Sequence, residues 1–128
     1  MSHPLVSTPS AHSEFLLPAP VHGEGIADYV ARVLDLKSEI ATGYLAVAFD
    51  NATLCDRKQL DYGPRNISGF GVFGVLVRMN DKFERLKTLH ADGQKRRKPK
   101  NESIRDTYRD IANYAVISLM LQGGLWPK

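Results

Sequence analysis

The sequence has almost no cysteine and no long apolar run. Cys55 is the only cysteine among 128 residues, which excludes an internal disulfide and a cysteine-based metal cage. Arg, Asp, Asn or Gly interrupts each apolar run before it reaches membrane-spanning length, and four prolines interrupt the first 21 residues. We therefore expect a cytoplasmic protein with no membrane partner.

The signatures of several common sites and folds are also missing. The four histidines have no i,i+4 pairing, and the glycine-rich segment 69–74 lacks the lysine and the hydroxyl of a phosphate-binding loop. No segment alternates between apolar and polar residues over a useful length, and no 20–50-residue repeat occurs. These absences leave an all-helical domain as the expected class.

Apolar residues at three- and four-residue spacing predict three main helices. The first runs from residue 26 to about 55, the second covers 69–91 after a cap at Asn66 or Ser68, and the third begins near 101–103 and ends at 123–124. Residues 1–23, rich in Pro, Ser and His, are expected to form a flexible arm, and residues 24–128 a single helical domain. Because the third helix is apolar on more than one face, we expect homo-oligomerisation to complete the bundle.

The net charge of +3 depends on one short basic cluster, residues 95–100. A nucleic-acid partner is conceivable at Lys95 to Lys100, because clustered cations attract phosphates. No aromatic residue is interleaved for base stacking, so a solvated connector between helices is the favoured interpretation.

Two polar stripes occupy the second and third predicted helices. At about 100° per residue, each stripe falls within an arc of roughly 80–100°. The first comprises Arg78, Asp81, Lys82 and Arg85, and the second comprises Glu102, Asp106, Asp110 and Asn113.

Asp110 and Asn113 are the most informative members, because they lie in a segment that otherwise has the composition of a core. A buried carboxylate is costly unless a cation, a metal or a substrate compensates it. The stripes can be a structural salt-bridge network, or they can form a site. In a site, Arg78, Lys82 and Arg85 would hold phosphates, and the carboxylates would hold Mg²⁺. The metal-binding residues would be Glu102, Asp106 and Asp110, with Asp106 and Asp110 catalytic.

Three motifs resemble the nucleotide-modification-associated domain 1 family of bacteria and their phages. They are Lys58-x-x-Asp61-Tyr62-Gly63, Val77-Arg78-x-x-Asp81-Lys82-x-x-Arg85-Leu86 and Glu102-Ser103-x-x-Asp106-Thr107-x-x-Asp110-Ile111-Ala112-Asn113-Tyr114-Ala115. The resemblance covers roughly residues 55–120. It implies a role in nucleotide or DNA-base modification in a bacterial or phage-infected cell. It also adds Lys58, Asp61, Tyr62 and Asn113 to the expected substrate-binding residues.

A more distant likeness is to MazG-like all-alpha nucleotide pyrophosphohydrolases, which bind Mg²⁺ through acidic residues on two antiparallel helices. This likeness implies that Asp81 and Glu84 form a first acidic pair, which adds Asp81 to the expected metal ligands, and that Glu102, Asp106 or Asp110 forms the second. The leading hypothesis is thus a Mg²⁺-dependent, pyrophosphohydrolase-like enzyme acting on a nucleoside phosphate. The alternatives are a non-catalytic protein that binds or sequesters a nucleotide or nucleotide signal, and a nucleic-acid-binding accessory protein.

Overall fold

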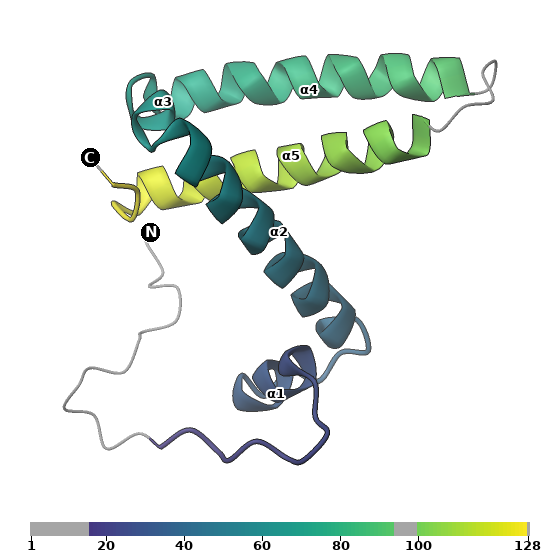
Figure 1. Ribbon diagram of the computed structural model, residues 1–128, viewed down its shortest axis with the longest axis vertical. Helices are drawn as coiled ribbons and strands as arrows, with labels where there is room; N and C mark the ends of the chain where they lie inside the picture. The colour runs from purple at the N-terminus through teal and green to yellow at the C-terminus, as the bar shows by residue number, and fades with distance from the viewer. Residues whose placement is uncertain (1–15, 94–99, 128) are drawn as a thin grey trace. The chain divides into compact units, whose positions relative to one another are not determined.

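The computed structural model describes residues 16–93 and 100–127, which form helices and contain no strand (Figure 1). The all-α class is therefore confirmed, and three of the five helices in the described residues are long, as expected for the main helices. The five helices are α1 (Ile26–Val33), α2 (Ala41–Tyr62), α3 (Arg65–Ser68), α4 (Gly71–Gly93) and α5 (Lys100–Gln122).

The chain divides into two compact units, residues 1–50 and 51–128. The division falls within α2 rather than at the end of the expected arm. A single domain covering residues 24–128 stays a prediction, and the two units are described separately below.

The prediction of one continuous helix from residue 26 to about 55 is wrong, because α1 ends after eight residues. Asp35 has a positive φ of 56°, a left-handed conformation in which Asp is one of the few tolerated non-glycine residues. The Asp35 N–H donates to the Arg32 carbonyl at 3.1 Å, and the Leu36 N–H donates to the Ala31 carbonyl at 2.9 Å. This pair of bonds is the Schellman arrangement that closes a helix C-terminus.

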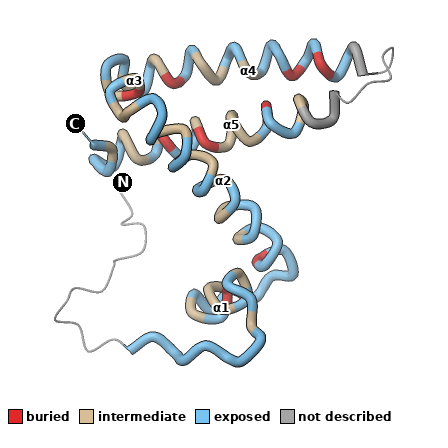
Figure 2. Tube along the Cα trace, viewed as in Figure 1, coloured by how far each residue is buried: buried red, intermediate tan, exposed pale blue. Residues whose placement is uncertain are grey.

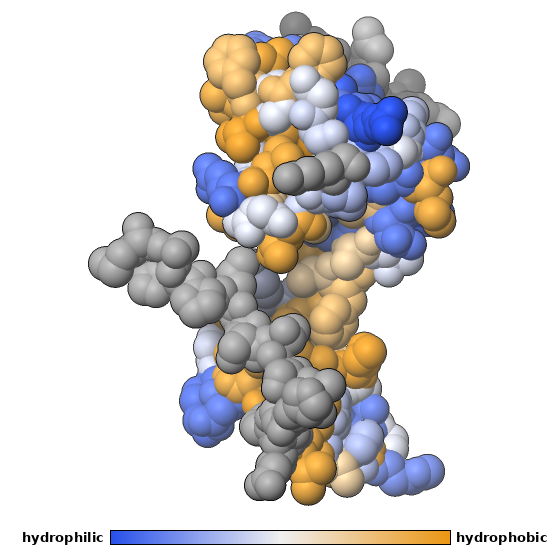
Figure 3. Space-filling model, turned by 90° about the vertical axis from the view of Figure 1, so that its left-hand side faces the viewer, coloured by the Kyte–Doolittle hydropathy of each residue, from blue (hydrophilic) through white to orange (hydrophobic). Residues whose placement is uncertain are grey.

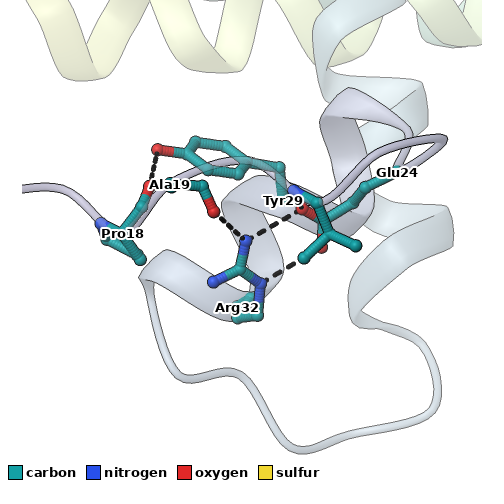
Figure 4. A network of polar contacts seen from close by, with 6 residues as sticks. Pro18, Ala19, Glu24, Tyr29 and Arg32 are labelled. Atoms are coloured by element: carbon teal, nitrogen blue, oxygen red, sulfur yellow. Dashed lines mark hydrogen bonds and ion pairs between the residues drawn. The ribbon is translucent and has the colours of Figure 1, made fainter.

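In the first unit, the segment before α1 is bound to that helix by polar contacts (Figure 4). Arg32 Nη2 donates to Glu24 Oε1 at 2.9 Å and to the Ala19 carbonyl at 3.0 Å, while the Tyr29 hydroxyl donates to the Pro18 carbonyl at 2.7 Å. The Arg32 hydrogen bond lowers the pKa of Glu24. Part of the expected arm thus has defined contacts, and residues 1–15 lie outside the described range.

In the second unit, α2 ends where the sequence predicted a break. Gly63 has a φ of 76°, and its N–H donates to the Gln59 carbonyl at 2.8 Å. Pro64 is then the N-cap residue of the short helix α3. The two residues predicted to cap the second main helix, Asn66 and Ser68, lie inside α3 instead, so that capping prediction is wrong.

The core of the second unit lies where α4 and α5 run side by side in opposite directions, with α3 packed at the start of α4 (Figures 1 and 2). Ile67, Val75 and Ile117 are almost fully buried there, at 2%, 1% and 3% exposure. The partly buried residues packed against them are Cys55, Met79, Tyr114, Leu121 and Trp126. Helix α5 ends at Gln122, next to the glycines predicted to stop it.

No helix in the described part of the chain is long and apolar enough to span a bilayer. Homo-oligomerisation stays a prediction.

Candidate functional site

Two charged residues lie on the packed faces of α4 and α5. Lys82 is seven residues after the buried Val75 on α4, and Asp110 is seven residues before the buried Ile117 on α5. Seven residues are about two helical turns, so each charge lies on the same side of its helix as the core residue. Since α4 and α5 are antiparallel, the register that packs Val75 with Ile117 also brings Lys82 to Asp110.

The Asp110 carboxylate binds two ammonium groups, one on each oxygen. Lys58 Nζ, from α2, donates to Oδ1 at 2.6 Å, and Lys82 Nζ, from α4, lies 2.9 Å from Oδ2. The Asp110 side chain is 15% exposed, whereas those of Lys58 and Lys82 are 45% and 30% exposed. Asp110 therefore ties α5 to both other long helices of the second unit and is fully compensated in charge.

Burial acts to raise the pKa of Asp110, because a low-dielectric environment disfavours the charged carboxylate. The hydrogen bonds from Lys58 and Lys82, together with their positive charges, outweigh burial. The pKa of Asp110 consequently lies below its usual value, and the group is ionised at neutral pH.

These groups face a pocket with a volume of about 350 Å³, within the range of small-molecule sites. The pocket has contributions from α2, α3, α4 and α5. The residues lining it are Cys55, Lys58, Gln59, Tyr62, Asn66, Ile67, Arg78, Lys82, Asp110, Asn113, Tyr114 and Ile117. With Lys58, Arg78 and Lys82 positive and Asp110 negative, its lining carries three positive charges and one negative, a net charge of +2.

Arg78 is held differently from the two lysines. Its Nη2 donates to the backbone carbonyl of Asn66 at 3.2 Å, which links α4 to α3. Among the described ion pairs none joins Arg78 to a carboxylate. Because a guanidinium has five N–H donors, Arg78 keeps donors for a ligand.

Some of the site residues expected from the sequence line the pocket. Lys58, Tyr62, Arg78, Lys82, Asp110 and Asn113 line it, and Asn113 is 8% exposed. The other expected residues Asp61, Asp81, Arg85 and Asp106 are exposed and lie outside the lining. Each polar stripe is therefore split: some of its residues line the pocket, and the others are exposed on the surface.

Two expectations fall on parts of the chain that the structure does not describe. The side chain of Glu102, an expected metal ligand, is not described, and neither are residues 95–99 of the basic cluster or the side chain of Lys100. Within the described part of the chain, no three His, Cys, Asp or Glu residues are grouped so that they could hold a metal ion.

Sequence reasoning found only part of the contribution of the end of α2 and missed that of α3. Cys55, Lys58, Gln59 and Tyr62 all line the pocket, and their spacings of three, one and three are those of one helical face. That spacing could have identified the group, but only Lys58 and Tyr62 were expected there. Burial raises the pKa of the Cys55 thiol, so this cysteine is a poor nucleophile.

The described part of the chain is all-helical, and its second unit has a pocket of about 350 Å³ whose lining carries a net positive charge. The sequence model of nucleotide modification associated domain 1 matches residues 58–121. The chain therefore belongs to this family. No curated protein and no solved structure matches it. The comparisons give no support to the more distant likeness to MazG-like pyrophosphohydrolases.

Proposed function

We propose that this protein binds a nucleotide in the pocket of its second unit and holds the phosphates with Lys58, Arg78 and Lys82. The observation that carries the proposal is the excess of positive charge in a pocket of about 350 Å³. The family description, which names nucleotide modification, supports a nucleotide over other anions. The setting would be nucleotide or DNA-base modification in a bacterial or phage-infected cell.

The hydrogen-bonding capacity of the three cations supports the same conclusion. Each ammonium group has three N–H donors and gives one bond to Asp110, so two remain on both Lys58 and Lys82. Phosphate oxygens accept such charge-assisted bonds strongly, and Arg78 can contribute a bidentate pair. Asp110 would act as a positioning residue that holds the two ammonium groups toward one another.

The pocket residues do not fit Mg²⁺. Asp110 is the carboxylate in the lining, and ammonium groups already bind both of its oxygens. Asp81 and Asp106, the other described carboxylates expected to bind the metal, are exposed and outside the pocket. We therefore favour binding over metal-dependent hydrolysis, and pyrophosphohydrolase-like catalysis stays a prediction that the same experiment addresses.

The test is incubation of the protein with NTPs and dNTPs, with Mg²⁺ or with EDTA, followed by chromatography of the free and total nucleotide. The expected result is depletion of free nucleotide and its intact recovery after the protein is denatured. Appearance of NMP and pyrophosphate only with Mg²⁺ would favour catalysis, and the absence of both depletion and products would refute the proposal.

Substitution of the positively charged pocket residues tests whether the nucleotide binds in this pocket. We expect Arg78→Met and Lys82→Met each to weaken nucleotide binding about tenfold or more, since a charge-assisted hydrogen bond contributes about 1.5–3 kcal/mol. Arg85→Met is the matched control, because Arg85 is on the same helix but exposed and outside the pocket. Thermal melts of each variant with and without nucleotide separate ligand binding from a purely structural role. In the structural case, Lys82→Met would lower the melting temperature and leave the ligand-induced shift unchanged.

A further inference from the structure

One polar side chain in the pocket lining is buried yet has no hydrogen-bond partner among the described residues. Asn113, on α5, is 8% exposed and lines the pocket. None of the side-chain hydrogen bonds described for the second unit involves its amide. Buried polar groups are nearly always bonded, and an unbonded one opposes folding, so an amide in this largely apolar stretch of α5 needs an explanation.

The Asn113 amide is open to the pocket. Gln59 and Asn66 also line the pocket, but each of them has a side-chain oxygen that is sealed from solvent. Neither the oxygen nor the nitrogen of the Asn113 amide is among the sealed, unbonded atoms. Because this amide has no bond within the described chain and is not sealed, it reaches solvent, and the solvent-accessible space that Asn113 lines is the pocket.

The packing register places this amide beside the cations of the proposed phosphate site. Asn113 is three residues after Asp110, which is roughly 4.5 Å along the helix axis from the carboxylate that binds both lysines. Lys82 is level with Asp110, and Arg78 is four residues before Lys82 on α4. Because α4 and α5 are antiparallel, Arg78 is level with Asn113. A ligand held by Lys82 and Arg78 therefore has the Asn113 amide within reach.

The chemistry of the amide suits the uncharged part of such a ligand. Ionised phosphate oxygens only accept hydrogen bonds, and the three cations already supply N–H donors for them. The carbonyl oxygen of the Asn113 side chain needs a donor, which an ionised phosphate lacks. A side-chain amide donates and accepts at once, which matches the edge of a base or a sugar hydroxyl.

We infer that Asn113 recognises the uncharged part of the nucleotide, its base or its sugar, through the side-chain amide. This inference rests on the proposed nucleotide binding and names the residue that determines what is recognised besides phosphate. The cations bind a nucleotide and an inorganic polyphosphate alike, whereas the Asn113 amide favours the nucleotide. The pocket distinguishes the two anions on that basis.

The test compares Asn113→Leu, a near-isosteric variant that lacks the amide, with the unsubstituted protein by calorimetric titration. The probes are tripolyphosphate and the tightest-binding of ATP, GTP, CTP and UTP. We expect Asn113→Leu to bind the nucleotide about three- to tenfold more weakly and to bind tripolyphosphate as the unsubstituted protein does. Asn113→Ala removes the same amide without adding apolar bulk and should show the same selective loss. Asn80→Leu is the control, because Asn80 is exposed on α4 outside the pocket and its replacement leaves both affinities unchanged.

Thermal melts give an independent readout of a structural role. Replacing an unbonded, buried amide with an apolar group of similar shape breaks no bond within the described chain, so ligand-free Asn113→Leu should melt at the same temperature or higher. A lower melting temperature in both variants, together with equal loss of nucleotide and tripolyphosphate binding, would show that Asn113 supports the fold and would overturn the inference.

Two analogues distinguish the sugar from the base. The 2′,3′-dideoxy form of the nucleotide lacks the sugar hydroxyls, and ribose 5-triphosphate lacks the base. The analogue without the recognised group should bind Asn113→Leu and the unsubstituted protein equally, and the other analogue should keep the difference. An undiminished difference with both analogues would overturn the inference, and so would unchanged nucleotide binding in both variants, while anion binding by the cations would stand. If no phosphate compound binds, the proposed function fails together with this inference.

Discussion

At the scale of single residues, the site depends on how a buried carboxylate is compensated. Asp110 lies in a segment of core composition, and the structure compensates it with Lys82 from the predicted basic stripe and with Lys58 from another helix. A buried ion pair contributes little net stability, yet removing one partner leaves a charge uncompensated. The arrangement is therefore better suited to fixing the positions of the ammonium groups than to adding stability.

The lowered pKa of Asp110 predicts a specific acid dependence of stability. A carboxyl whose folded-state pKa is depressed contributes stability above its unfolded value, about 3.9, and loses that contribution as the pH falls through the folded value. Asp110→Asn cannot titrate, so its free energy of unfolding should decline less steeply than that of the unsubstituted protein below about pH 4. Urea denaturation at a series of pH values measures the difference between the two curves.

Asp106→Asn is the matched control for this pH series, because Asp106 is an exposed carboxyl on the same helix. Its curve should follow that of the unsubstituted protein. Parallel curves for Asp110→Asn and the unsubstituted protein would contradict the linkage of Asp110 to acid stability.

At the scale of the elements, local backbone geometry explains why the positions at the start of α4 are glycines. Glycines at a helix start also allow a partner helix or a ligand to approach the backbone closely. The structure instead shows Gly71 with a positive φ of 65°, and a Cβ placed on Gly74 would overlap the Cβ of Phe70 in the preceding turn. The glycines thus permit the tight junction between α3 and α4 that places Asn66 at the pocket.

Gly74→Ala is expected to destabilise the protein although alanine is the better helix former. The gain in helix propensity is about 1 kcal/mol, but the overlap with Phe70 forces a backbone or side-chain shift, and overpacking typically costs about 1–3 kcal/mol. We expect a net loss of up to about 2 kcal/mol in the free energy of unfolding, measured by urea titration. Asn80→Ala, an exposed site further along α4, is the control and should be neutral or slightly stabilising. A stabilised Gly74→Ala would show that the junction relaxes without cost.

At the scale of the whole molecule, the described surface contains large exposed apolar side chains, and exposed apolar surface often marks an interaction site. Phe70, Phe73 and Leu76, at the start of α4, are 74%, 75% and 57% exposed, and Figure 3 shows apolar side chains at the surface over this end of the second unit. Helix α5, which the sequence suggested as the interface, buries Ile117 within the chain but leaves Val116 and Leu119 51% and 56% exposed, less than the two phenylalanines. The start of α4 is thus the better candidate for an interface.

We expect light scattering at micromolar concentration to give a multiple of the monomer mass. Phe73→Glu should shift the protein toward the monomer, since a buried charge opposes the association of apolar surfaces. Leu34→Glu is the control, because Leu34 is an exposed apolar residue between α1 and α2 in the other unit. A monomer for the unsubstituted protein, with no change on Phe73→Glu, would exclude the oligomer.

The sequence by itself determined the helical class, the breaks after α2 and α5, and the family. Periodicity identifies helices because apolar spacing follows from helix geometry, and Gly63-Pro64 and Gly123-Gly124 end helices through local backbone chemistry. The sequence-based prediction of a continuous first helix failed at Asp35. A left-handed aspartate ends that helix, and the sequence carries no unambiguous local signal for it. The capping of the second main helix was also mispredicted, since the short helix α3 has no periodicity long enough to detect.

Only the tertiary structure decided which polar residues form the pocket. Angular position on a helix gives a stripe, but the packing of α4 against α5 determines which part of the stripe is inside, so Lys82 and Asp110 meet while Arg85 and Asp106 remain exposed. The partnership of Lys58 with Asp110 joins residues 52 positions apart, which no local spacing encodes.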